Sequence, residues 1–158
     1  MTQSDGSRWV STHEGRHLAG RRRTDTKPEI ALRKALHAAG FRFRIHTSLA
    51  KGCTPDIVLP RWRTVVFVDG CFWHGCPVHG RQRPWTGPNA ALWQEKMAAN
   101  QRRDITATRL AEDLGWKVER VWECEVRADA ALCVEQIRER LTERQPPGQL
   151  GKPSRQDC

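Results

Sequence analysis

The chain has 158 residues, of which 38% are hydrophobic and 28% charged, a composition typical of one globular domain that excludes fibrous and wholly disordered classes. No apolar run approaches the roughly 18 residues of a membrane span, and residues 1–20 lack the apolar core of a secretory signal, so we expect a cytoplasmic protein. The net charge of +9 favours nucleic acid as a partner, since neutralised phosphates release counterions, although a generic basic surface would carry the same charge.

The N-terminal part predicts a basic arm followed by a helix. Residues 1–24 are irregular and end in a run of three arginines that begins at Arg21. We interpret them as a DNA-contacting arm, and a solvated tail fits the composition equally well. The helix begins sharply, because Thr26 as N-cap, Pro28 in the first turn and Glu29 three residues after the threonine form a capping box.

A strand and a hairpin are predicted next. The helical spacing of apolar residues stops at Gly40, and residues 41–45 then alternate with the period of a strand. Two more strands, 55–59 and 64–68, are separated by a turn short enough to make them a hairpin. Residues 69–89 show no periodicity, and a structureless loop of about 20 residues in a compact domain is usually functional or held by a bound group.

The C-terminal part predicts a long polar helix at 91–113, an alternating strand at 117–122 and a last helix at about 130–144. Residues 145–158 are rich in Pro, Gly and Gln and are expected to be a disordered tail. The order of elements predicts an α/β domain at 25–144, in which helices flank a central mixed sheet.

Two groups of residues are candidates for metal ligands. Asp56 opens a predicted strand, where a carboxylate suits Mg²⁺, although an Asp after Pro is also an ordinary start of a strand. Cys71, Cys76 and His79 offer the N/S ligands of a tetrahedral zinc site, and Cys124 is the best candidate for the fourth. Six cysteines in a reducing compartment favour metal over disulfides. The alternative is that some of these cysteines are merely buried apolar side chains.

The residues between the candidate zinc ligands have two interpretations each. His74 is either a further zinc ligand or a general base whose pKa lies near neutrality. Phe72 and Trp73 either pack in the core or insert as a wedge between base pairs.

The long polar helix carries a third pattern. Lys96, Asn100 and Asp104 step by four residues and therefore share one face. Lysine and asparagine can reach base edges, but any solvated helix face could show this pattern.

Taken together, these residues resemble the very-short-patch-repair (Vsr) family of DNA mismatch endonucleases. The resemblance covers about residues 18–128, most of the chain, and the Cys-Phe-Trp-His block is its most specific part. It rests on four blocks in order: Thr24 to Glu29, Pro55-Asp56, Phe67 to Pro77, and Gly115-Trp116 through Cys124.

The resemblance implies a type-II-restriction-endonuclease-like core of the PD-(D/E)xK type with a structural zinc site. It also implies Mg²⁺-dependent nicking of one strand 5′ to the T of a T:G mismatch, which arises when 5-methylcytosine is deaminated. Its implied partners are mismatched double-stranded DNA, a cytosine-5 DNA methyltransferase, and a downstream repair polymerase and ligase. A monomer is the default, since no heptad or long exposed apolar stripe is present.

The resemblance also assigns roles to residues. Asp56 would bridge the catalytic metals, with the backbone carbonyl of Val68 as a second protein ligand. His74 would act as the general base or position it, and Glu29 would orient metal-bound water or a second histidine. The structural zinc would be held by Cys71, Cys76, His79 and Cys124. DNA would be contacted by Phe72 and Trp73 beside the mismatch, by Lys96 and Asn100 at the T:G pair, and by Leu18 and Arg21 in the arm.

The chain departs from the family pattern in ways that leave questions open. The second hairpin strand lacks the lysine of the usual nuclease signature. Val68 stands where some members have Thr, and Asp69 stands where they have a second histidine, so the general base is open and Asp69 is a further candidate for the metal site. A nickase or endonuclease of different specificity is the main alternative. A zinc-stabilised DNA-binding module without catalysis would leave Glu29, Asp56 and His74 incidental.

Overall fold

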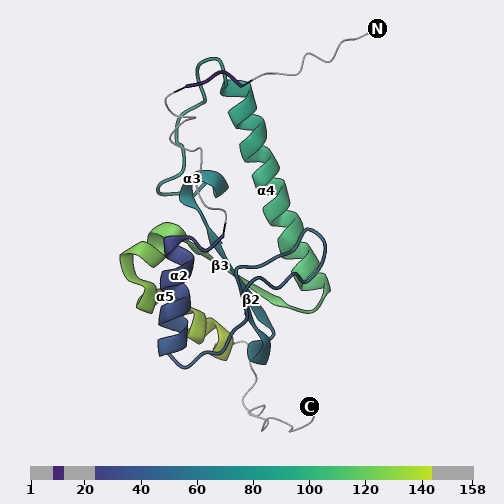
Figure 1. Cartoon of the computed structure of the whole chain (residues 1–158), viewed down its shortest axis with the longest axis vertical. Helices are drawn as coiled ribbons and strands as arrows, with labels where there is room; N and C mark the ends of the chain where they lie inside the picture. Colours follow the sequence, from purple (N-terminus) through teal and green to yellow (C-terminus); the bar gives the residue numbers. More distant parts are fainter. Residues whose placement is uncertain (1–8, 13–23, 144–158) are drawn as a thin grey trace.

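The computed structural model describes residues 9–12 and 24–143, and Figure 1 shows their arrangement. Leu18 and Arg21 of the predicted arm, and the predicted disordered tail 145–158, lie outside the described residues. The elements are α2 (Lys27–Ala38), β1 (Ile57–Leu59), a 3-10 turn η1 (Pro60–Trp62), β2 (Thr64–Asp69), α3 (Cys71–His74), α4 (Ala90–Asp113), β3 (Lys117–Trp122) and α5 (Glu123–Glu143).

Three strands form a mixed sheet in the order β1-β2-β3, which confirms the predicted α/β class and mixed sheet. β1 pairs antiparallel with β2, with Ile57 opposite Val66, as the predicted hairpin requires. β2 pairs parallel with β3, with Phe67 opposite Arg120. A parallel pair needs a long crossover, and α3 and α4 provide it.

Both faces of the sheet are covered by helices (Figure 1). Successive strand residues point to opposite faces, so Val66 joins the core with α2 and α5 while Val65 and Phe67 pack toward α4. Only the C-terminal half of α4, through Ala107 and Ala111, belongs to this core. The N-terminal half extends past the sheet and contacts α3 instead.

The start of α2 confirms the predicted cap. Thr26 Oγ1 accepts a hydrogen bond from the Glu29 N–H at 3.5 Å. The Glu29 carboxylate accepts from Thr26 Oγ1 at 2.9 Å and from the Asp25 N–H at 2.8 Å, one residue earlier than a capping box requires. These bonds fix Glu29 as a buried side chain at the helix start.

Three predicted elements differ from the structure. The strand predicted at 41–45 is wrong: only Arg44 pairs, in a two-bond bridge with Val58. The neighbouring strand β1 has three residues, and Val58 is the one whose backbone N–H and C=O bond to this segment. The last helix begins at Glu123 and not near 130. Asp129 (φ −160°) interrupts it and accepts the Leu132 N–H at 2.9 Å, so the prediction found only the second half.

The third difference is that 69–89 is not wholly irregular, since it contains the four-residue helix α3. No helix in the ranges 9–12 and 24–143 is long and apolar enough to cross a membrane.

Candidate active site and metal centre

Asp56 lies directly before β1, with its carboxylate turned toward the end of β2. Its Oδ2 accepts a hydrogen bond from the Val68 N–H at 2.7 Å, which ties the two hairpin strands together beside the site. Burial raises the pKa of Asp56 to about 6, and the nearby negative charges of Glu29 and Asp69 contribute to the rise. A cation bound here would stabilise the ionised form of Asp56. Its oxygen donors therefore fit Mg²⁺, whose ligands are carboxylates, carbonyls and water.

Glu29 is near Asp56 but is engaged by other partners. Besides the two bonds of the helix cap, its Oε2 lies 3.2 Å from Arg33 Nη2. Arg33 also forms an ion pair with Asp25 at 2.5 Å. These contacts hold Glu29 rigidly at the edge of the site, and its predicted role toward metal-bound water stays a prediction.

His74 ends α3 and pairs with a carboxylate from α4. Its Nδ1 lies 2.5 Å from Asp104 Oδ2 and 3.8 Å from Asp69 Oδ1. An ionised carboxylate only accepts, so Nδ1 donates and the neutral ring keeps its lone pair on Nε2. The pair thus has the geometry of a general base oriented by a third group.

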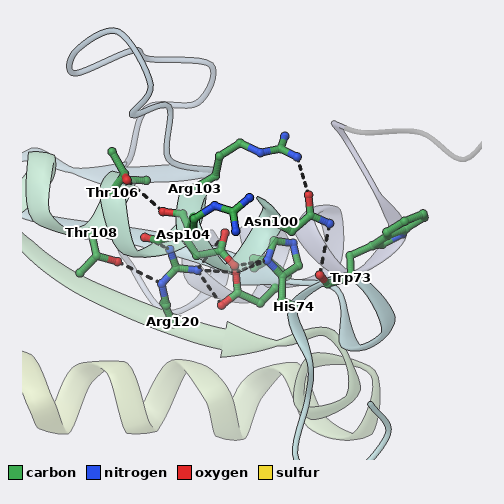
Figure 2. A network of polar contacts seen from close by, with 12 residues as sticks. Trp73, His74, Asn100, Arg103, Asp104, Thr106, Thr108 and Arg120 are labelled. Carbon is green, nitrogen blue, oxygen red and sulfur yellow. Dashed lines mark hydrogen bonds and ion pairs between the residues drawn. The ribbon is translucent and has the colours of Figure 1, made fainter. Parts of the chain in front are cut away.

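Arg120 of β3 completes this network (Figure 2). Its Nη1 donates to both oxygens of Asp69, at 2.6 and 2.8 Å. Its Nη2 donates to the backbone carbonyl of Asp104 at 3.1 Å, and its Nε to Thr108 Oγ1 at 3.3 Å. The guanidinium also lies over the ring of Phe67, 4.6 Å from the centroid.

The four predicted zinc ligands come together in space. The Sγ and nitrogen atoms of Cys71, Cys76, His79 and Cys124 all lie within 4.8 Å of one another. Cys76 Sγ is 3.9 Å from Cys124 Sγ, and Zn–S bonds of about 2.3 Å in a tetrahedron separate two sulfurs by about 3.8 Å. The donor set and its spacing fit zinc. His74 lies in a different group, with Asp69 and Asp104, so the geometry favours its interpretation as a base over that as a zinc ligand.

The loop around Cys76 is built to hold this geometry. Burial raises the pKa of the Cys76 thiol, but the N–H groups of His79 and Val78 outweigh it and lower that pKa to about 6, which favours the thiolate that metals bind. The Gly80 N–H donates to the Cys76 carbonyl at 2.7 Å. A Cβ on Gly80 would lie 2.3 Å from that oxygen, so the turn excludes every other residue type.

Phe72 and Trp73 lie in an aromatic cluster where α3 meets α4. Phe72 makes edge contacts with Trp73 and Trp93, at centroid distances of 5.0 and 5.9 Å, and Trp85 stacks on Trp93 at 5.1 Å. Trp9 joins from the N-terminal segment, 5.0 Å from Trp93. Trp93 is the buried centre, whereas Phe72 and Trp73 are half-exposed. The pair therefore packs within the protein, and its insertion between base pairs stays a prediction.

The two predicted base-reading residues border the same cluster. Lys96 Nζ lies 5.0 to 5.5 Å from the ring centroids of Trp73, Trp9 and Trp93. Asn100 Nδ2 donates to the Trp73 carbonyl at 3.3 Å. One turn of α3 therefore connects the aromatic cluster, through Phe72 and Trp73, to the His74 network.

Comparison with known proteins identifies the family. The family model described as DNA mismatch endonuclease Vsr matches residues 11–79. The Type II nicking enzyme V.NaeI of Lentzea aerocolonigenes is 45% identical over 129 residues, which cover 79% of this chain and 76% of that protein. The DNA mismatch endonuclease Vsr of Escherichia coli is 36% identical over 119 residues, 75% of this chain and 74% of that protein. The chain belongs to the Vsr family. The Type II nicking enzyme V.NmeAIP of Neisseria meningitidis is 42% identical over 113 residues, 72% and 78% respectively.

As a Vsr-family endonuclease, the protein acts on DNA and is a hydrolase. Its three-stranded mixed sheet with flanking helices is compatible with a restriction-endonuclease-like core. The family also explains the net charge of +9, which the sequence analysis left open between nucleic acid and a generic basic surface.

Several residues of this Vsr-family site were not recognised from the sequence. The partnership of Asp104 with His74 was missed, although its position on the face of Lys96 and Asn100 was a signal. Arg120 looked like one polar position of an alternating strand, and nothing in the sequence pointed to Asp69 as its partner. The aromatic neighbours Trp9, Trp85 and Trp93 were missed as well, because they are far from α3 in the sequence.

Proposed function

We propose that this Vsr-family endonuclease nicks one strand of duplex DNA 5′ to the T of a T:G mismatch and thereby starts very short patch repair. The observation that carries the proposal is the composition of α3. Within four residues it supplies a candidate zinc ligand, two half-exposed aromatic side chains and a histidine paired with a carboxylate. A wedge and a general base on one helical turn couple recognition of a distorted base pair directly to hydrolysis.

The residues of this chain divide the chemistry between them. His74, oriented by Asp104, accepts the proton of the attacking water at Nε2. Asp56 and the Val68 carbonyl would hold Mg²⁺, and the ion when bound stabilises the charge that develops on the transferring phosphoryl group. Glu29 supports the site from the start of α2. Buried and near one another, Asp56 and its carboxylate neighbours have the negative charge that such an ion requires.

A structural zinc ion would be held by Cys71, Cys76, His79 and Cys124. Four protein ligands leave no open position, so zinc would stabilise the fold and take no part in hydrolysis. Cys71 comes from α3 and Cys124 from the start of α5, so the site would join the crossover to the end of β3.

Recognition would rest on deformation and on base contacts. A T:G wobble pair is easier to distort than a matched pair. Insertion of Phe72 and Trp73 would therefore cost less deformation energy at the mismatch, which would select it. Lys96 and Asn100 border the aromatic pair, close enough to read the exposed base edges. Leu18 and Arg21 would contact DNA from the arm 1–24. A cytosine-5 DNA methyltransferase would supply the 5-methylcytosine whose deamination gives the T:G pair. A repair polymerase and a ligase would then act on the nick. That the enzyme is monomeric and cytoplasmic stays a prediction.

A nickase of different sequence or lesion specificity is the second candidate. It is favoured by the names of the relatives, since proteins 45% and 42% identical to this chain are described as Type II nicking enzymes. The catalytic residues would be shared, and the difference would lie in the arm and in the base-reading face of α4. A non-catalytic zinc module is disfavoured, because it leaves the hydrogen-bonded His74–Asp104 pair without a purpose.

Strand-specific cleavage tests the proposal. Duplexes with a T:G pair or a matched C:G pair, labelled separately on each strand, are incubated with zinc-loaded protein in Mg²⁺ or EDTA. We expect a Mg²⁺-dependent nick beside T in the mismatched duplex alone. Cleavage of both duplexes or of both strands would support a nuclease of other specificity. Folded, zinc-loaded protein that cleaves no duplex would contradict the catalytic assignment.

A further inference from the structure

Arg120 lies between the two carboxylates that flank His74, and its contacts are those of a fixed cation. Nη1 reaches both oxygens of Asp69 at 2.6 and 2.8 Å, and the same atom is 3.9 Å from Asp104 Oδ1. Nη2 is bound to the Asp104 carbonyl. Arg120 is thus connected to both carboxylates, which come from β2 and α4. Figure 2 shows Arg120 beside Asp104 and His74.

The guanidinium does here what a bound metal ion could otherwise do. Asp69, His74 and Asp104 place three ligand atoms within 4.8 Å of one another, which is close enough for one cation. Both Asp69 oxygens are already bound to Arg120, so its positive charge neutralises the group from within the protein. A planar guanidinium that binds a carboxylate and a carbonyl together also fixes their relative orientation, which a spherical ion does less strictly.

Two carboxylates compete for one histidine in this arrangement. Asp104 Oδ2 is 2.5 Å from His74 Nδ1, and Asp69 Oδ1 is only 3.8 Å from the same nitrogen. A small rotation of the ring would exchange one partner for the other and would redirect Nε2. Because Arg120 holds Asp69, a single partner remains for Nδ1.

Arg120 is itself held in place by its surroundings. Its guanidinium lies over the ring of Phe67, its register partner in β2, and Nε donates to Thr108 of α4. A side chain restrained by a ring, a hydroxyl, a carbonyl and a carboxylate has little freedom left, so it can transmit the geometry of the sheet to the histidine.

We propose that Arg120 is a positioning residue for strand nicking: it binds Asp69, keeps that carboxylate away from His74, and leaves Asp104 as the sole partner that orients the ring. The inference rests on the proposed nicking function and adds to it a residue that acts through Asp69 and through the orientation of His74. It also gives Asp69 a defined role: its carboxylate lies close enough to His74 to compete with Asp104, and Arg120 prevents this by binding it.

The test compares Arg120→Met and Arg120→Lys with a matched control, Arg138→Met. Arg138 also donates to a backbone carbonyl, that of Ala39 at 3.0 Å, and lies over a phenyl ring, that of Phe41, but on the α2–α5 side of the sheet. Single-turnover nicking of the duplex that the wild type cleaves, half-saturation by DNA and thermal unfolding are measured for each. A misoriented catalytic group commonly costs about 10²-fold, so we expect Arg120→Met to nick about 10²-fold more slowly with half-saturation unchanged.

Arg120→Lys keeps the inference falsifiable if Arg120→Met folds poorly. This variant keeps the charge but replaces the rigid planar guanidinium with a flexible ammonium group, which does not fix the carboxylate and the carbonyl relative to each other. We expect it to fold and to nick about tenfold more slowly. Asp69→Asn combined with Arg120→Met removes the competing charge, so we expect it to nick faster than Arg120→Met alone.

Several results would overturn the inference. One is that Arg120→Lys nicks at the wild-type rate. Another is that Arg120→Met and Arg138→Met lose the same fraction of the rate, in proportion to their loss of stability. A third is that the double variant nicks no faster than Arg120→Met. An inactive wild type would instead count against the proposed function, so the two failures are distinguishable.

Discussion

The two clusters that meet at α3 are built in opposite ways. The candidate zinc-ligand cluster takes three of its four residues from the stretch between Cys71 and His79, and only Cys124 is distant in sequence. The network around His74 takes each further member from another element, with Asp69 from β2, Asp104 from α4 and Arg120 from β3. A local cluster depends on the conformation of one loop, whereas a dispersed one depends on the whole sheet and crossover. Variants in the dispersed network should therefore change the rate of nicking, whereas variants in the local cluster should change stability and zinc content.

The largest expected effect is on catalysis, from Asp56, whose carboxylate interacts electrostatically with Asp69 of the dispersed network. Asp56→Ala should reduce nicking by a factor on the order of 10³ or more, because the carboxylate that would hold Mg²⁺ is lost. Binding of the mismatched duplex, measured by fluorescence anisotropy, should persist. Loss of binding together with activity would show that Asp56 has a structural role through its bond to Val68.

The local cluster should respond in stability and zinc content. Cys124→Ser should release zinc and lower the free energy of unfolding by several kcal/mol (about 3 or more), because binding of a structural zinc is part of the folding free energy. Zinc per chain and thermal unfolding are the measurements. Cys133→Ala is the control, since Cys133 is a buried cysteine of the α5 core outside the cluster. Full zinc content in Cys124→Ser would show that the fourth ligand is another residue.

A smaller loss of activity is expected from a change of Asp104, the partner of His74. Asp104→Asn can present its amide N–H₂ to His74 and so allow the wrong tautomer, which should slow nicking by about 10²-fold. Asp113→Asn, at the end of the same helix, should nick at the wild-type rate. Equal rates for Asp104→Asn and Asp113→Asn would remove Asp104 from the mechanism.

The smallest expected effect is a pH-dependent stability. The pKa of Asp56 is raised to about 6 in the folded protein, above the ordinary 3.8, so the folded state holds the proton more tightly than the unfolded state. The stability that this group contributes is present at low pH and is lost as pH rises from about 4 to about 6. In EDTA, the free energy of unfolding of Asp56→Asn should therefore increase relative to that of the wild type as the pH rises. The difference between the two proteins should change by about 2 kcal/mol from pH 4.5 to pH 7.5. A constant difference in the midpoint of thermal unfolding across this range would contradict the assignment.

The contrast between local and dispersed clusters also explains what the sequence could predict. The cap at Thr26, the hairpin and the strand at 117–122 were predictable because each depends on a short pattern. The residues of the cysteine cluster were found from the spacing within one loop together with the family resemblance. The strand predicted at 41–45 failed because alternation does not report how many backbone groups the neighbouring strand offers for pairing.

The His74 network could be predicted only in part. Asp104 was placed on the correct face of its helix, but a helical period does not say which residue from another element faces it. Arg120 and Asp69 are opposite in charge and come from neighbouring parallel strands, with the register set by the crossover. That register depends on the packing of α4 on the sheet, which no pattern in either strand reveals.

The brevity of α3 has a consequence for how enzymes of this kind can change. Each residue of an α-helix is rotated by about 100° from the one before, so an insertion or deletion within Cys71–His74 would turn these side chains relative to one another and away from their present partners. A change of length in this stretch would therefore disturb both clusters at once. New target preferences would arise more readily on α4, where Lys96 and Asn100 can be changed without altering the length of α3, although Asn100 also donates to the Trp73 carbonyl. An engineer seeking a nickase for another lesion should randomise that face first and leave the four-residue turn untouched.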